Sequence, residues 1–230
     1  MPPLDTPLAT ILPDLEQRAA AGDAAAACRI AAERATCGWL RAQREHHLAW
    51  AAAEQKKFEI TSASASPEVV AQAARQLDVE MSRREAQLEA NESRCEGVEV
   101  PSPASIAANW RRAARLGSPS AMRYWASGQA IQPNGVLDAL DELAAYRAGA
   151  PAMAHLLVRD GDLAMTLLMA TATAPLSSRT MSLLGQAVEE DAALSLALYR
   201  RALAALEAAG DPGPATLRLA CGSASKSSAA

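Results

Sequence analysis

The sequence predicts an all-α protein, and three of its features lead to that prediction. Half of the residues are hydrophobic, but alanine is unusually frequent and aromatic residues reach only 3%. Strand-forming residues are sparse, and no segment sustains the alternation of apolar and polar residues that a half-buried strand needs. Short Ala-rich segments instead end at glycines followed by a capping residue or a proline, which are stop and start signals of consecutive helices.

One short helical unit is written twice within residues 109–154. In each copy an Ala-rich helix is predicted to end at a glycine, Gly117 or Gly149. A proline two residues later, Pro119 or Pro151, is predicted to open the next helix. We therefore expect antiparallel helix pairs stacked into a short α-solenoid. Weaker copies of the unit lie at residues 19–28, 159–165 and 207–215.

The N-terminal part is predicted to contain an arm and one helix pair. Residues 1–12 are interrupted by prolines and are expected to be a flexible arm. Residues 13–37 are expected to form the first helix pair, with Pro13 in the first turn and Gly22-Asp23 between the helices. The second helix of this pair is expected to end near Thr36.

Residues 38–96 are predicted to form a coiled-coil-like helical hairpin. Two charged helical segments cover about residues 39–94, with a loop at residues 61–66 between them. In the second segment, a series of positions alternates spacings of four and three residues, which is the period of a two-helix coiled coil. That series is Val70, Ala74, Leu77, Met81, Arg84, Leu88, Asn91 and Cys95.

Residues 103–221 are predicted to form a helical repeat domain, and residues 222–230 a disordered tail. Within the repeat domain, helices are expected at about residues 103–116, 119–130, 135–148, 151–159, 162–173, 178–187, 190–209 and 213–220.

The four cysteines show no Cys-x-x-Cys spacing and no cluster with histidine, so a zinc site is not expected. Cys37 and Cys95 flank the hairpin, and the midpoint between them falls on Ser66, inside its loop. Antiparallel arms would bring both sulfurs to the base of the hairpin. We predict a Cys37–Cys95 disulfide, with free thiols as the alternative. Cys28 and Cys221 would pair only if the ends of the solenoid approach each other.

Charge and hydropathy limit the partners and the compartment. A net charge of -4 provides no basic surface, so nucleic acid is not an expected partner. No run of eighteen apolar residues occurs, so no transmembrane segment is expected. The N-terminus lacks the pattern of a signal peptide, which by itself indicates a cytoplasmic protein. The predicted disulfide instead favours a periplasmic or secreted protein whose signal peptide has been removed.

No nucleophile elbow, metalloprotease, phosphate-loop or dinucleotide motif occurs, so we expect no enzymatic activity and no cofactor. A hydrolase or metal enzyme is the remaining alternative. The nearest resemblance to a metal site is His46-His47 with Glu45 and Glu54. Adjacent histidines point about 100° apart on a helix and cannot chelate one ion together, so we expect a structural role for them and no metal.

A basic and aromatic group in the first copy of the unit is the best candidate for binding a protein or peptide, because such residues dominate interface hot spots. In the alternative interpretation, Trp110 and Trp125 fill gaps between Ala-rich helices while the arginines are solvated. The candidate partner-binding residues are Arg111, Arg112, Arg115, Arg123, Tyr124 and Trp125.

The unit resembles the Sel-one-like repeat, a bacterial relative of the tetratricopeptide repeat, over about half of the chain. The resemblance implies a solenoid that presents a concave surface to a peptide or protein, without intrinsic catalysis. It rests on Ala114, Gly117, Ser118, Ala121, Met122, Tyr124 and Gly128 in the first copy, on Ala145, Gly149, Ala152, Met153 and Leu156 in the second, and on Ala19, Gly22, Asp23, Ala26 and Ile30 in a partial third.

The sequence therefore predicts a non-enzymatic scaffold or adaptor for protein–protein interaction. An inhibitor or immunity-type protein that binds its partner in the bacterial periplasm fits this class. The alternative is a structural or assembly component that self-associates through the hairpin. The sequence does not identify the partner or the oligomeric state.

Overall fold

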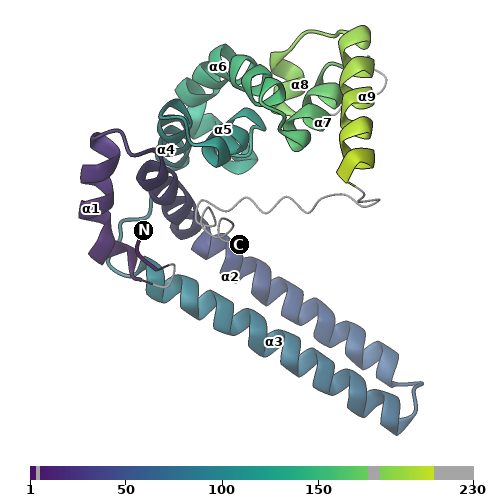
Figure 1. Cartoon of the computed structure of the whole chain (residues 1–230). Helices are drawn as coiled ribbons and strands as arrows, with labels where there is room; N and C mark the ends of the chain where they lie inside the picture. Colours follow the sequence, from purple (N-terminus) through teal and green to yellow (C-terminus); the bar gives the residue numbers. More distant parts are fainter. Residues whose placement is uncertain (4–5, 176–181, 210–230) are drawn as a thin grey trace, which may run out of the picture. The chain divides into compact units, whose positions relative to one another are not determined.

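The computed structural model describes residues 1–3, 6–175 and 182–209. Nine α-helices and one 3₁₀ helix, without any strand, make up the regular structure of this part of the chain (Figure 1). The prediction of an all-α fold is confirmed. No described helix is both long enough and apolar enough to span a membrane.

The chain divides into two compact units. Unit 1 contains Met1, Asp14–Ala32 and the chain from Ser102 onward, and unit 2 contains Pro2–Pro13 and Glu33–Pro101. The boundaries fall inside two helices, so α1 (Leu8–Ala20) and α2 (Ala24–Ser62) each contribute residues to both units, and α3 (Pro67–Cys95) lies in unit 2. The helices of unit 1 that follow α3 are α4 (Pro103–Arg115), α5 (Pro119–Ala126), η1 (Pro133–Ala139), α6 (Leu140–Arg159), α7 (Leu163–Ala172), α8 (Leu183–Ala187) and α9 (Ala192–Ala209).

Three turns between helices use the same glycine geometry. Gly22, Gly117 and Gly161 all have φ between 88° and 96°, a left-handed conformation in which glycine avoids a steric penalty. At the second of these turns, the Ser118 N–H donates to the carbonyl of Ala113 (3.2 Å), which lies five residues earlier. Equivalent bonds close the other two turns at 3.0 and 2.9 Å. Each turn is therefore a Schellman motif that ends one helix and reverses the chain.

The residue after each of these glycines starts the next helix by capping it. The Asp23 carboxylate accepts from the N–H groups of Ala25 and Ala26, at 2.9 and 3.0 Å. Ser118 and Asp162 accept in the same way from backbone N–H groups three residues later. A left-handed glycine followed by a capping side chain is thus the local signal that separates these helices.

The predicted turn at Gly149 is wrong, because α6 continues through Gly149 and Pro151 to Arg159. The expected helices at 135–148 and 151–159 are therefore replaced by η1 and one long helix. Gly149 is followed by Ala150, which has no side-chain acceptor with which to cap a new helix. The turn instead lies at Gly161, where the sequence showed only a weak copy of the unit.

Unit 2 contains a long helical hairpin, made by α2 (Ala24–Ser62) and α3 (Pro67–Cys95), which lie side by side (Figure 1). A Cys37–Cys95 disulfide, with the Cα atoms 5.5 Å apart, joins the two helices at the base of the hairpin. This confirms the predicted pairing. At the other end, the Ser66 hydroxyl caps α3 by accepting from the Val69 N–H.

Two helix boundaries near the N-terminus differ from the prediction. The first helix, α1 (Leu8–Ala20), begins inside the expected arm and contains Pro13 in its interior. Leu8 and Leu15 are fully buried, and this burial outweighs the one backbone hydrogen bond that the proline removes. The second helix, α2, does not end near Thr36, because Gly38 alone costs only about 1 kcal/mol in a helix and no capping motif follows it.

Some predictions concern residues outside the described ranges. These are the beginning of the expected helix at 178–187, the expected helix at 213–220, the weak copy beyond residue 209, the tail at 222–230 and the possible pairing of Cys28 with Cys221.

Candidate functional site

The arginines of the predicted binding group do not share one role. Arg111 in α4 donates two hydrogen bonds to the Glu142 carboxylate in α6, at 2.9 and 2.7 Å. The Glu142 side chain is only 10% exposed, so this two-point ion pair is largely removed from water. Breaking such a pair would leave a buried carboxylate without a counter-charge. Arg111 therefore holds α4 against α6.

Arg123 makes a similar link from α5. Its Nε donates to the Asp162 carboxylate at 2.7 Å, and its Nη2 makes a second, shorter contact with the same oxygen. The other carboxylate oxygen of Asp162 caps α7 by accepting from the Met165 N–H at 2.8 Å. Arg123 thus connects α5 to the beginning of α7.

The aromatic residues of the group pack inside unit 1. Trp125 is 1% exposed and meets Tyr146 edge-on, with ring centroids 5.6 Å apart. The Tyr146 hydroxyl donates to the Ala126 carbonyl at 2.9 Å, and burial raises the pKa of this phenol. Trp110 is 5% exposed and stacks on Tyr124 at 4.0 Å. The tryptophans therefore fill the gaps between Ala-rich helices, and Trp125 has almost no surface for a partner.

Arg112 and Arg115 remain available on the outer face of α4. Both are exposed, and they lie three positions apart, so they are neighbours on one side of the helix. Neither makes an ion pair or a side-chain hydrogen bond within the described ranges. Of the six candidate residues, these two form the surface that could bind a partner.

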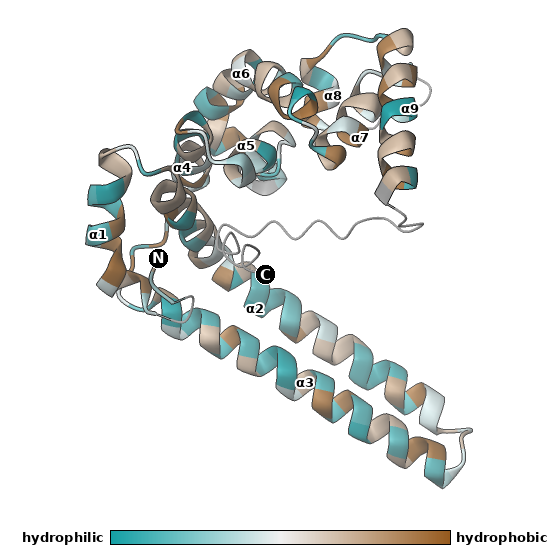
Figure 2. Ribbon diagram, in the orientation of Figure 1, coloured by the Kyte–Doolittle hydropathy of each residue, from teal (hydrophilic) through white to brown (hydrophobic). Residues whose placement is uncertain are grey.

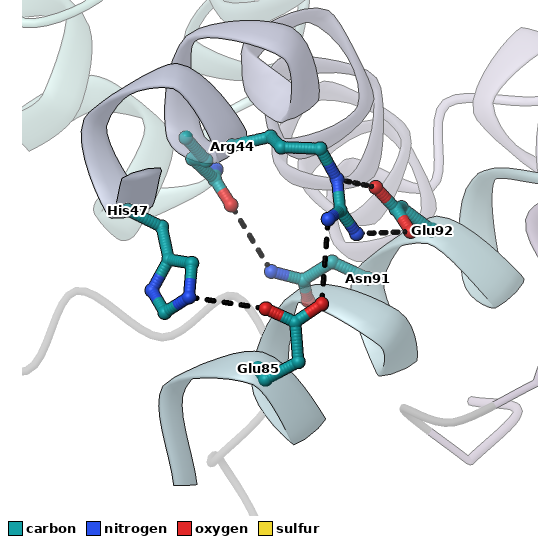
Figure 3. A network of polar contacts seen from close by, with 6 residues as sticks. Arg44, His47, Glu85, Asn91 and Glu92 are labelled. Carbon is teal, nitrogen blue, oxygen red and sulfur yellow. Dashed lines mark hydrogen bonds and ion pairs between the residues drawn. The ribbon is translucent and has the colours of Figure 1, made fainter. Parts of the chain in front are cut away.

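Unit 2 has a polar cluster of its own, in the half of the hairpin next to the disulfide (Figure 3). Arg44 in α2 donates two hydrogen bonds to Glu92 in α3, at 2.7 and 2.8 Å, and a third to Glu85 at 3.3 Å. These hydrogen bonds hold the pKa of Glu92 below its ordinary value. His47 contacts the other oxygen of Glu85 at 3.0 Å, and Asn91 donates to Gln43 at 3.2 Å.

This cluster fixes the register of the hairpin. In four contacts between α2 and α3, the mean of the two residue numbers lies between 66 and 68, close to the loop. These contacts are Cys37–Cys95, His47–Glu85, Gln43–Asn91 and Arg44–Glu92. The symmetry about the loop that predicts the cysteine pair also applies to the polar residues of the two helices. Reflection about Ser66 places His47 opposite Glu85, and it places Arg44 opposite Leu88, which lies between Glu85 and Glu92 on α3.

The histidines have no metal-binding arrangement. His47 is held by Glu85, and His46 is exposed on another side of α2. The described residues include no group of three His, Cys, Asp or Glu side chains placed to hold a metal ion.

Comparison with known proteins gives no relative from which a role could be inferred. No family model, no curated protein and no solved structure matches the chain.

Proposed function

We propose that this protein is a non-enzymatic protein-binding scaffold, in which Arg112 and Arg115 on α4 contact an acidic segment of a partner protein or peptide. The supporting observation is that these two arginines are exposed and have no ion-pair partner among the described residues, whereas Arg111 and Arg123 form ion pairs within unit 1. A guanidinium group recognises a carboxylate through two parallel hydrogen bonds.

The ion pairs of Arg111 and Arg123 give this surface a rigid support. They join α4 to α6 and α5 to α7, so α4 is held in place before a partner arrives. Preorganisation of this kind lowers the entropic cost of binding. Exposed arginines contribute mainly to the rate of association and to specificity, so apolar contacts nearby would supply further affinity.

The proposal of a repeat-type scaffold in the bacterial periplasm rests on the repeated turns and on the disulfide. The turns at Gly22 and Gly117, in two of the three copies that carry the resemblance to Sel-one-like repeats, have the same glycine geometry and support it. Repeats of that family bind proteins. The Cys37–Cys95 disulfide is compatible with an oxidising compartment. An adaptor or inhibitor in the bacterial periplasm combines both features.

The experiment is a quantitative pull-down from an extract of the native compartment. The test variant carries Arg112→Ala and Arg115→Ala, and the control variant carries Arg200→Ala and Arg201→Ala, which remove two exposed arginines from α9. We expect the test variant to bind the captured protein about 2- to 30-fold more weakly, and the control to bind like the unmodified chain. Equal binding by both variants would contradict the assignment of α4.

A further inference from the structure

The part of the hairpin beyond the disulfide leaves its helices without a closed core. Next to the disulfide, Cys37, Leu88, Asn91 and Cys95 are all buried. Between residues 38 and 87, in contrast, not one residue is buried. Both helices expose apolar side chains along this length, for example Leu48 (60% exposed) on α2 and Val79 (67% exposed) on α3. Hydrophobic residues alternate with hydrophilic ones along both helices (Figure 2). Two helices alone do not cover these side chains.

A groove runs along one side of this segment. A cleft of about 350 Å³ lies between α2 and α3, with Trp50, Phe58 and Leu77 among its walls. A second hollow of about 320 Å³ continues over the surface of α3 as far as Val79. The two hollows are adjacent, because Gln76 and Glu80 line both of them, and together they are called the groove here.

The residues that border the groove follow the period of a helix bundle. From α2, Trp50, Glu54, Lys57 and Thr61 line the cleft at spacings of four, three and four residues. On α3, Val69, Gln72, Gln76 and Val79 have spacings of three, four and three residues, and the last three line the groove. This stripe is separate from the heptad series that faces α2. A helix with two heptad stripes can pack against more than one neighbour, as in a four-helix bundle.

The charges around the groove balance. Glu54 and Glu80 line it together with Lys57 and Arg75, so each sign is present twice. Hydrogen bonds from Arg83 and Arg84 lower the pKa of Glu80 to about 2, so this carboxylate is ionised at neutral pH. Arg75 makes no ion pair among the described residues. A surface with equal numbers of both signs can complement a second copy of itself.

We propose that this groove binds the same groove of a second copy of the chain, so that two hairpins form a four-helix bundle with twofold symmetry. A twofold interface requires a self-complementary surface, and the balanced charges meet that requirement. The helix length from residue 38 to 62 is about 37 Å and the hairpin is roughly 20 Å wide. A face of this size buries more than the approximately 1,000 Å² that a stable dimer needs.

The test measures the mass of the full chain by sedimentation equilibrium over a range of concentrations. The test variant carries Gln76→Glu and Val79→Glu, which place two carboxylates in the groove, and both positions are exposed in the single chain. The control is Ala71→Glu, which adds a carboxylate to an exposed position of the same helix outside the groove. Far-UV circular dichroism and thermal melting verify that each variant folds.

We expect the unmodified chain and Ala71→Glu to form dimers, with half of the chains dimeric at the same protein concentration. The test variant should need at least about tenfold higher concentration to dimerise. Lys57→Glu with Arg75→Glu, which makes the groove wholly acidic, should also weaken the dimer, and added salt should partly restore it. Arg112→Ala with Arg115→Ala should leave the dimer unchanged, so failure of the α4 proposal would not affect this result.

Three outcomes would overturn the proposal. The first is an unmodified chain that stays monomeric up to about 1 mM. The second is a dimer that Gln76→Glu with Val79→Glu and Ala71→Glu affect equally. The third is a monomer that captures a different helical protein through the groove, since that protein would then be its occupant.

Discussion

The helices of unit 1 and the hairpin of unit 2 are both rich in alanine, but different interactions hold them together. In unit 1, aromatic side chains such as Trp125 and Tyr146 fill the space between short helices, and ion pairs with nearly buried carboxylates connect the helices. In the hairpin, a disulfide and a row of partly exposed ion pairs join two long helices that have no buried residue between positions 38 and 87. The comparison shows that helix-forming composition does not determine how helices are stabilised. That depends on whether large side chains are available to fill the gaps.

The largest expected effect tests the role of the disulfide in the hairpin. Replacing Cys37 and Cys95 by serine opens a loop with a sequence separation of 58 residues. The loop-entropy relation predicts that the free energy of unfolding of unit 2 falls by about 4 kcal/mol. Urea denaturation followed by far-UV circular dichroism measures this loss. A loss below about 1 kcal/mol would mean that packing, rather than the cross-link, holds the hairpin.

The next effect tests the core of unit 1. Tyr146→Phe removes the hydroxyl that donates to the Ala126 carbonyl, and that buried acceptor is left without its partner. We expect the free energy of unfolding to fall by about 1–2 kcal/mol. Tyr199→Phe is the matched control, because its hydroxyl is on an exposed side chain and, among the described residues, hydrogen-bonds only to Thr171. Equal losses in the two variants would show that the buried hydrogen bond contributes nothing specific.

A third prediction separates a true turn from a glycine inside a helix. Gly161 has φ of 88°, so Gly161→Ala should destabilise unit 1 by about 1 kcal/mol. Gly149 lies inside α6 with open space around the position of a Cβ atom, so Gly149→Ala should stabilise it by up to about 1 kcal/mol. Thermal denaturation of both variants shows whether each substitution lowers or raises the stability of unit 1. Destabilisation by Gly149→Ala would place a turn there after all.

The smallest effect concerns the ion pairs of the hairpin. Because Arg44 holds the pKa of Glu92 below its ordinary value of 4.5, this pair stabilises the hairpin above that pH. The contribution disappears as the pH falls through the lowered pKa of the folded state. Glu92→Gln should therefore be less stable than the unmodified chain at neutral pH, with a difference that shrinks in acid. A difference that is constant from pH 7 to about pH 2 would exclude this electrostatic origin.

The sequence was sufficient for features that depend on neighbouring residues. The turns at Gly22 and Gly117 were predicted because a glycine and a capping residue stand together, and both are present. The Cys37–Cys95 bond followed from the symmetry of two arms about one loop. The turn at Gly149 was predicted wrongly because Pro151 alone was taken as the start of a new helix, although no capping residue follows the glycine.

The candidate site was less predictable. The sequence grouped six residues by type and spacing, but it could not show that Glu142 and Asp162 lie opposite Arg111 and Arg123. Those carboxylates are 31 and 39 residues further along the chain. The groove on the hairpin was missed for a similar reason, because its walls come from two helices.

Helix formation, the turns at Gly22 and Gly117 and the disulfide register of this protein were determined by the sequence itself, because each depends on local geometry or on one symmetric fold-back of the chain. Only the tertiary structure decided which arginines form ion pairs with distant carboxylates, which aromatic rings are buried and which apolar residues of the hairpin are exposed. These properties depend on contacts between residues far apart in sequence, and in such contacts burial and charge pairing outweigh the local preferences.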